Sequence, residues 1–260
     1  MKILFLGDIF GDAGREAVRR LVPKVRQEHN IDFVIGNCEN AVNGMGITPK
    51  VAEEFFAVPL NVLTSGNHIF HHKDIQDYIA KTPKLLRPAN YLASMPGKGV
   101  WMGEVYAGVK LAVINLIGQV FMGAANNPFE AADRELKNVE GEADIILVDM
   151  HGEATSEKTA MAHYLDGRVS AVFGTHTHIP TADERVLPKG TAYITDVGMC
   201  GPYDSIIGMQ KEIVVQKFVT GMHNKYLQAT GDARLSGAIV DVEENTGKAR
   251  SIQRIQEKLV

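Results

Sequence analysis

Two histidines one residue apart, His176 and His178, carry the strongest sign of chemistry in this sequence. They follow an apolar stretch, residues 169–173, that is typical of a buried strand. Residues i and i+2 of an extended chain face the same side, so both imidazoles would point into one space. Neutral imidazole is a frequent metal ligand. Taken alone, the pair is compatible with a metal site or with ordinary hydrogen bonding at a strand end.

Polar side chains that can bind a metal follow four other apolar stretches. They are Asp8, Glu39, Asn40, Asn67, His68 and His151. The carboxyl ends of neighbouring parallel strands meet at one edge of a sheet, so these groups should collect along a single rim. Each has an ordinary alternative when taken alone: Asp8 could cap a helix, and Asn40 could form an Asx turn. Together they predict a metal centre.

The types of these residues suggest distinct roles. The two carboxylate oxygens of Glu39 can bridge two cations, and the amide oxygens of Asn40 and Asn67 can each bind one. Gly66 precedes Asn67 and allows a sharp backbone turn below a bound ligand. We expect His68 to reach outward and to serve as a proton donor.

Length and composition limit the class of protein. At 260 residues, with 45% hydrophobic and 22% charged residues, the chain suits one large globular domain that covers residues 1–260. No segment approaches the roughly 18 apolar residues of a membrane span, and the N-terminal stretch lacks the features of a signal peptide. Cys38 and Cys200 form no zinc-binding spacing and are expected to be reduced thiols. These features predict a cytoplasmic protein that does not bind membranes.

Charge and loop composition argue against two kinds of nucleotide-binding protein. The net charge is −4 and no basic block exists, so long nucleic acid is not an expected partner. A phosphate-bearing substrate would be small and would need metal ions for positive charge. The glycine-rich loop at residues 7–14 lacks the Gly-x-Gly-x-x-Gly pattern, and Asp8 stands where a pyrophosphate would approach. A dinucleotide-binding oxidoreductase is therefore disfavoured.

The elements that must position these groups alternate between strand and helix. The first series predicts strands at residues 2–6, 32–35 and 61–64, with helices at 13–29 and from Thr48 and Pro49 onward. The second predicts helices at 128–140 and 156–165, with strands at 144–150 and 169–173. Strand-like alternation also marks residues 100–106, 110–116, 191–196, 212–219 and 237–242, the last leading into a hairpin turn at 243–247. Such repeats favour parallel strands, and two sheets flanked by helices would accommodate the mixture.

The order of these motifs resembles that of the calcineurin-like metallophosphoesterase superfamily. In that order come Gly-Asp, an acidic segment, Gly-Asn-His, a histidine at a strand end and Gly-x-His-x-His. The chain resembles the bacterial YmdB-type branch more closely, and this match covers nearly the whole chain. It is carried by the stretches at residues 7–12, 37–41, 66–70, 150–158 and 195–202. The resemblance implies an α/β fold of the metallophosphatase kind, a four-layer αββα sandwich in which two central mixed β-sheets are flanked by helices.

The resemblance also implies metal ligands and a reaction. The ligands of the first metal would be Asp8, Glu39, Asn40 and His178, and those of the second would be Glu39, Asn67, His151 and His176, with Glu39 bridging. The reaction would be hydrolysis of small phosphodiesters, with 2′,3′-cyclic nucleotides as the first expectation and 3′,5′-cAMP as another. Two cations would clamp the phosphate and lower the pKa of a water molecule, and His68 would protonate the expelled alkoxide.

The sequence departs from the superfamily pattern at the first metal position. The usual Asp-x-His motif is Asp8, Ile9 and Phe10 here, so Asn40 must replace the missing imidazole. An oxygen-rich site suits iron or manganese better than zinc, and iron is also what the resemblance implies. We therefore expect two divalent or trivalent ions of iron or manganese as the cofactor.

A second interpretation belongs to a different class of protein. A regulatory protein could hold a metal and a nucleotide with little turnover, and it would not need His68. The complete set of catalytic positions favours the enzyme. The sequence identifies no substrate-binding residues, although the loops 121–128 and 198–207 are expected to surround the cleft. An edge strand in the β-rich C-terminal part could support a homo-oligomer.

Overall fold

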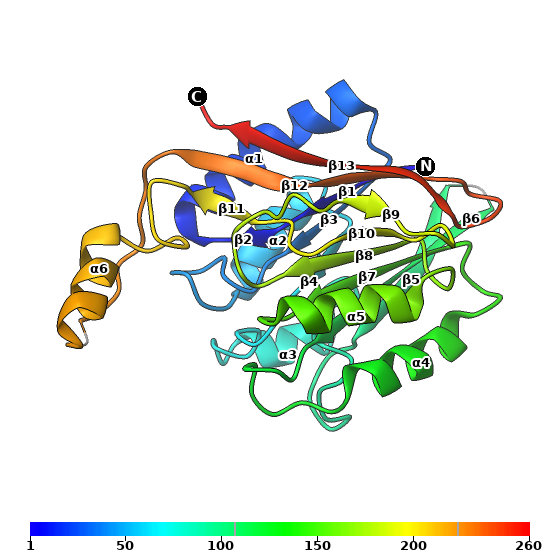
Figure 1. Ribbon diagram of the computed structural model, residues 1–260, viewed down its shortest axis with the longest axis horizontal. Coiled ribbons are helices and arrows are strands. Elements are labelled where there is room, and N and C mark those ends of the chain that lie inside the picture. Colours follow the sequence, from blue (N-terminus) through cyan, green and yellow to red (C-terminus); the bar gives the residue numbers. More distant parts are fainter. Residues whose placement is uncertain (107, 223) are drawn as a thin grey trace.

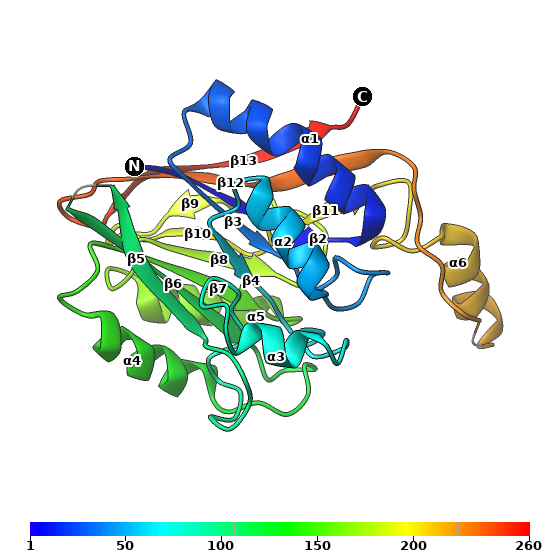
Figure 2. The same ribbon diagram turned by 180° about the vertical axis from the view of Figure 1, so that it is seen from behind.

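The chain folds into two facing β-sheets with helices on both outer sides (Figure 1 and Figure 2). The computed structural model describes residues 1–106, 108–222 and 224–260. The strands of the first sheet are β1 (Lys2–Leu6), β2 (Asp8–Ile9), β3 (Phe33–Asn37), β4 (Val62–Thr64), β11 (Met199–Pro202), β12 (Ala233–Val242) and β13 (Ala249–Lys258). Strand β1 runs parallel to β3 and antiparallel to β12, so this sheet is mixed.

The second sheet is also mixed. Its strands are β5 (Val100–Tyr106), β6 (Val109–Ile117), β7 (Ile145–His151), β8 (Ala171–Thr175), β9 (Arg185–Val186) and β10 (Ala192–Ile194). The neighbours β6, β7, β8 and β10 are parallel, whereas β5 and β9 pair antiparallel at the two edges. The carboxyl ends of the parallel strands therefore meet at one edge of the sheet.

Helices complete the outer layers. Helices α1 (Gly11–His29) and α2 (Pro49–Ala57) cover the first sheet, and α4 (Pro128–Val139) and α5 (Thr155–Leu165) cover the second (Figure 2). The short helix α3 (Ile75–Ile79) buries Ile75 and Ile79 in the same cluster as residues of α1 and α2, whereas α6 (Lys211–Thr220) projects away from the layers (Figure 1). The predicted four-layer αββα sandwich is confirmed.

The central strands bury both faces, which explains their continuous apolar sequences. In β1, Leu4 and Leu6 pack in the cluster that includes the α1 residue Val18. The alternate residue Phe5 points to the other side, into the cluster between the sheets, where its ring stacks on that of Phe173 at 4.4 Å. Successive side chains of a strand face opposite ways, so a strand between two layers needs apolar residues at every position.

The helix ends agree only partly with the sequence-based predictions. Pro49 lies in the first turn of α2, as predicted, and Thr48 occupies the position before it, but the Thr48 side chain makes no capping hydrogen bond. Helix α4 is capped by Asn127, whose side-chain oxygen accepts hydrogen bonds from the backbone N–H groups of Phe129 and Glu130. The hairpin predicted after residue 242 is confirmed by the antiparallel pairing of β12 and β13.

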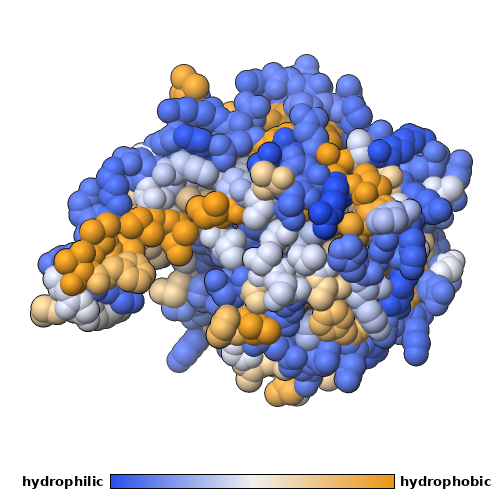
Figure 3. All heavy atoms as spheres, in the orientation of Figure 1, coloured by the Kyte–Doolittle hydropathy of each residue, from blue (hydrophilic) through white to orange (hydrophobic). Residues whose placement is uncertain are grey.

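The strand predicted at residues 212–219 is wrong, because this segment forms helix α6. Its β-branched residues resemble a strand, but α6 stands away from the sheets (Figure 1), so no neighbouring strand can accept its backbone hydrogen bonds. A helix satisfies these groups locally. Helix α6 exposes the apolar side chains of Val215, Phe218 and Val219. Figure 3 shows apolar surface along the part of the molecule that projects at the left, where α6 lies in Figure 1.

Both cysteines, Cys38 and Cys200, are unpaired and buried. Among the residues that the structure describes, no helix is both long and apolar enough to cross a membrane.

The packing between the sheets gives a stability prediction. Phe5→Ala should lower the free energy of unfolding by about 3–5 kcal/mol, because it removes a fully buried ring and leaves a cavity. Urea denaturation measures the change. The matched control is Phe218→Ala on α6, where the ring is 81% exposed and the change should stay within about 0.5 kcal/mol. Equal effects of the two substitutions would contradict this account of the core.

Candidate metal centre

All the predicted site residues lie at the carboxyl ends of the parallel strands. Asp8 follows β1, Glu39 and Asn40 follow β3, and Asn67 and His68 follow β4 in the first sheet. In the second sheet, His151 ends β7, and the pair of histidines follows β8. The two sheets face each other, so these five strand ends bring the side chains into one cluster.

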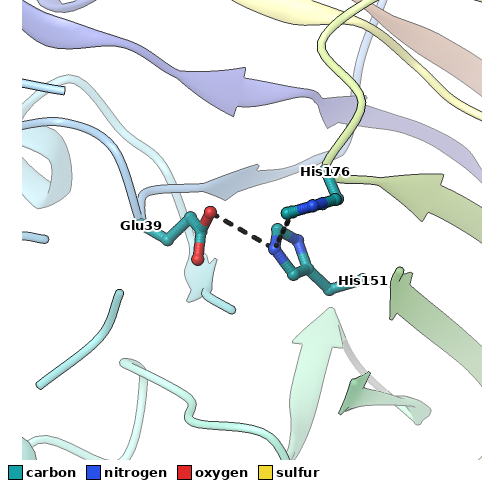
Figure 4. A group of neighbouring side chains, drawn as sticks. All are labelled: Glu39, His151 and His176. Atoms are coloured by element: carbon teal, nitrogen blue, oxygen red, sulfur yellow. Dashed lines mark hydrogen bonds and ion pairs between the residues drawn. The ribbon is translucent and has the colours of Figure 1, made fainter. Parts of the chain in front are cut away.

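The tightest part of the cluster surrounds Nε2 of His151 (Figure 4). This atom lies 3.2 Å from Oε1 of Glu39, 3.1 Å from Nδ1 of His176 and 3.2 Å from Oδ1 of Asn67. Atoms that bind one cation at about 2.0–2.2 Å are themselves about 3 Å apart. Glu39, His151 and His176 form a group that could hold a metal ion, since their ligand atoms all lie within 4.8 Å of one another.

A second set of potential ligands adjoins the first through Glu39. The Asn40 amide nitrogen lies 3.2 Å from Oε1 of Glu39 and 3.0 Å from Nε2 of His178. Its amide oxygen lies 2.8 Å from Nδ1 of His68. A half-turn of the amide would exchange these two atoms and point the oxygen at the carboxylate and the imidazole. The arrangement could therefore hold a second cation beside the first.

Asp8 contributes a buried carboxylate with unused hydrogen-bonding capacity. Its Oδ2 accepts a hydrogen bond from the backbone N–H of His176 at 3.0 Å. Its Oδ1 is buried and has no hydrogen-bond donor in the described part of the chain. Burial raises the pKa of this carboxyl group. A buried oxygen without a donor is costly, and a cation would compensate it.

The alternative interpretation of Asp8 as a helix cap is wrong. Phe10 occupies the N-cap position of α1, and the Asp8 carboxylate accepts a hydrogen bond from the backbone N–H of His176 rather than from the first turn of the helix. The backbone first forms the short strand β2, which pairs with β11, and this pairing carries the Asp8 carboxylate into the cluster instead of toward the helix.

Each imidazole of the cluster has a hydrogen-bond acceptor on its outer nitrogen. Nδ1 of His151 lies 2.8 Å from Oγ1 of Thr175, and Nδ1 of His178 lies 2.9 Å from the Ile207 carbonyl oxygen. Nε2 of His176 lies 3.1 Å from the Glu153 carboxylate. A proton held on the outer nitrogen leaves the lone pair on the inner one, which is the form that binds a metal. The donor set therefore suits a metal ion.

When only protein groups are present, protonation of His151 balances negative charge of the buried carboxylates. Burial tends to raise the pKa of Glu39, but the charge of His151 and hydrogen bonds from His151 and His68 hold it well below its usual range. Burial tends to lower the pKa of His151, but Glu39 and Asp8 raise it to about 9. A cation that binds these groups would displace the His151 proton, because metal ligands must be deprotonated.

A close approach of backbone and side chains requires glycine at residue 66. A Cβ atom on Gly66 would lie 2.2 Å from the His151 ring and 2.4 Å from Oε2 of Glu39. No side chain fits at these distances, so the glycine allows His151 and Glu39 to meet above the turn.

The loop that carries His176 and His178 is anchored by a buried ion pair that the sequence analysis missed. Nζ of Lys158 lies 2.9 Å from Oδ2 of Asp196 and donates a hydrogen bond to the Thr175 carbonyl oxygen at 3.3 Å. The same carboxylate oxygen accepts hydrogen bonds from the backbone N–H and the hydroxyl of Thr177. Both histidines have positive φ angles, 101° and 67°, and these contacts hold the loop in that conformation.

Two facing mixed sheets with metal-binding side chains at their carboxyl ends define a metallophosphatase-type α/β protein. The same fold is found in the sulfate thiohydrolase SoxB of Thermus thermophilus, with a TM-score of 0.58 and 12% identity over 97% of this chain and 43% of that one. The chain belongs to the family of YmdB-like proteins, whose model matches residues 4–255. The resemblance to the YmdB-type branch is thereby confirmed.

Two relatives are similar over almost the full length. A 2′,3′-cyclic-nucleotide 2′-phosphodiesterase of Bacillus subtilis (strain 168) is 45% identical over 255 residues, which cover 98% of this chain and 96% of that protein. The crystal structure of a phosphatase from Mycoplasma pneumoniae superposes with a TM-score of 0.93 and 34% identity, covering 99% of this chain and 93% of that one.

The anchoring ion pair gives a second stability prediction. Lys158→Met should lower the free energy of unfolding by about 3–5 kcal/mol, because it leaves the Asp196 charge buried without its cation. Urea denaturation measures the change, and Lys137→Met on the exposed side of α4 is the matched control. A loss no larger than that of the control would contradict the anchoring role.

Proposed function

We propose that this protein is a dinuclear-metal phosphodiesterase that hydrolyses small phosphodiesters, with 2′,3′-cyclic nucleotides as the first substrate class. The observation that carries the proposal is the convergence of Glu39, Asn67 and His176 on one nitrogen of His151. The activity named for the Bacillus subtilis relative supports the choice of substrate. Residues 1–260 would act as one catalytic domain.

Glu39 would bridge two ions of iron or manganese. The first ion would be bound by Asp8, Glu39, Asn40 and His178, and the second by Glu39, Asn67, His151 and His176. The bridging role is supported by Oε1 of Glu39, which lies 3.2 Å from both the His151 nitrogen and the Asn40 amide. Only one imidazole would bind the first ion, and an oxygen-rich set favours a hard metal.

When bound, two such cations neutralise the phosphate and activate the attacking water molecule. The protein must then supply a proton to the expelled alkoxide, and we assign this step to His68. Its side chain is 32% exposed, so it can reach a substrate in the cleft. Its Nδ1 faces inward, 2.8 Å from the Asn40 amide oxygen, and its backbone N–H donates to Oε2 of Glu39. With the Asn40 amide turned so that its oxygen faces the first ion, its nitrogen would donate to Nδ1 of His68, and the His68 proton would then be on Nε2, toward the leaving oxygen.

The remaining features suit a small substrate in the cytoplasm. The chain has a net charge of −4, which gives no electrostatic attraction for a long polyanion. Two buried unpaired thiols suit a reducing compartment. Among the described strands, β13 pairs only with β12, and its outer edge could join two copies in a homo-oligomer.

His68→Ala should retain both metals and lose activity in a manner that depends on the leaving group. Hydrolysis of a 2′,3′-cyclic nucleotide should slow by about 10²–10⁴-fold, because its alkoxide needs a proton. Hydrolysis of bis(p-nitrophenyl) phosphate should slow much less, because nitrophenolate leaves without one. Steady-state rates and metal content are measured on the same samples, with His72→Ala as the control.

Unchanged hydrolysis of the cyclic nucleotide by His68→Ala would refute the assignment of the proton donor. Two bound metals in the parent protein without turnover of either diester would instead favour a regulatory protein that holds a nucleotide.

Asn67→Ala should lose one of the two metal ions, because it removes an oxygen 3.2 Å from the His151 ligand atom. Metal content per chain is measured by inductively coupled plasma mass spectrometry after dialysis. Asn138→Ala on the exposed part of α4 serves as the control and should keep both ions. Two ions in the Asn67→Ala protein would contradict the assignment of Asn67.

A further inference from the structure

Glu153 makes a contact that the proposed reaction does not use. It lies in the turn between β7 and α5, two residues after His151. Its carboxylate lies 3.1 Å from Nε2 of His176, the nitrogen that faces away from the other ligands. The side chain of Glu153 is half exposed, whereas that of His176 is 21% exposed. The contact therefore lies at the rim of the cluster.

This contact decides which nitrogen of His176 carries the proton. The carboxylate can only accept a hydrogen bond, so Nε2 must be the protonated nitrogen when the two groups are joined. The lone pair is then on Nδ1, which lies 3.1 Å from Nε2 of His151. The ring is held between these two contacts, with its unprotonated nitrogen toward the proposed second metal.

The partner of His176 differs in charge from the partners of the other two imidazoles. His151 and His178 form hydrogen bonds with a hydroxyl and a backbone carbonyl, which are neutral acceptors, and the Asp8 carboxylate lies farther from Nδ1 of His151, at 3.8 Å. An ionised acceptor makes a stronger hydrogen bond and increases the basicity of the imidazole more than a neutral one does. Solvent screens a half-exposed carboxylate, so the orientation of the ring contributes alongside the charge.

Apart from its contact with His176, Glu153 has no structural role in the described part of the chain. Its side chain makes no other hydrogen bond or ion pair there. The loop of His176 is anchored separately by Lys158 and Asp196. Replacement of Glu153 should therefore leave the fold intact, in contrast to replacement of Lys158.

We propose that Glu153 is a positioning residue that sets the affinity of the second metal position by orienting His176. The proposal rests on the proposed function, which assigns His176 to that metal. Partners of this kind typically change metal affinity by about 10–100-fold. The first metal position, to which His176 does not belong, should be unaffected.

The test is a calorimetric titration of metal-stripped protein with Mn²⁺. Parent protein should bind two ions. Glu153→Ala should weaken one of the two affinities by about 10–100-fold, and Glu153→Gln, which keeps an acceptor but no charge, should lie between. Glu140→Ala, at the exposed end of α4, is the matched control and should resemble the parent. The thermal midpoints of all the metal-free proteins should be equal.

Parent-like affinities at both positions in Glu153→Ala would overturn the inference and leave the proposed function intact. Equal weakening at both positions with a lower thermal midpoint would also overturn it, because the residue would then be structural. Absence of Mn²⁺ binding by the parent would overturn the proposed function and, with it, the role of Glu153.

Discussion

Buried negative charge at the shared edge of the two sheets is the constraint on which the site depends. Four carboxylates are fully buried there: Asp8, Glu39, Asp149 and Asp196. A buried carboxylate is stable only with a cation or several hydrogen-bond donors beside it. Lys158 lies 2.9 Å from the Asp196 carboxylate, and His151 lies 3.2 Å from that of Glu39. One oxygen of Asp8 has no donor in the described part of the chain, and a metal ion bound by the proposed ligands would compensate it.

The fold concentrates this negative charge at one edge of the sheets because the faces of the central strands are covered by other layers. Both faces of the central strands are covered, one by helices and the other by the opposite sheet, so the polar groups of the site lie at or near the strand ends. Parallel neighbours end at the same edge, and the two facing sheets bring two such edges together. Asp8 and His176, which are 168 positions apart in the sequence, are thereby joined by a direct hydrogen bond.

Local signals were sufficient to predict most strands and helices and the clustered residues, whereas the four-layer sandwich was predicted from the resemblance to the metallophosphoesterase superfamily. An apolar stretch that ends in a carboxylate, an amide or an imidazole is visible without knowledge of the fold, and its position at a strand end determines its place in space. The prediction failed at α6, where β-branched residues resemble a strand and only the lack of a neighbouring strand shows otherwise. Lys158, Asp196 and Glu153 were missed because their roles depend on loops that approach from other strands.

The most direct test of the metal centre is anomalous X-ray diffraction from crystals of the protein loaded with Mn²⁺. This account predicts two anomalous peaks about 3.5–4 Å apart, one on each side of the Glu39 carboxylate. One peak should adjoin His178 and the other should adjoin His151 and His176. A single peak, or two peaks that do not share Glu39, would contradict a dinuclear centre at this edge of the sheets.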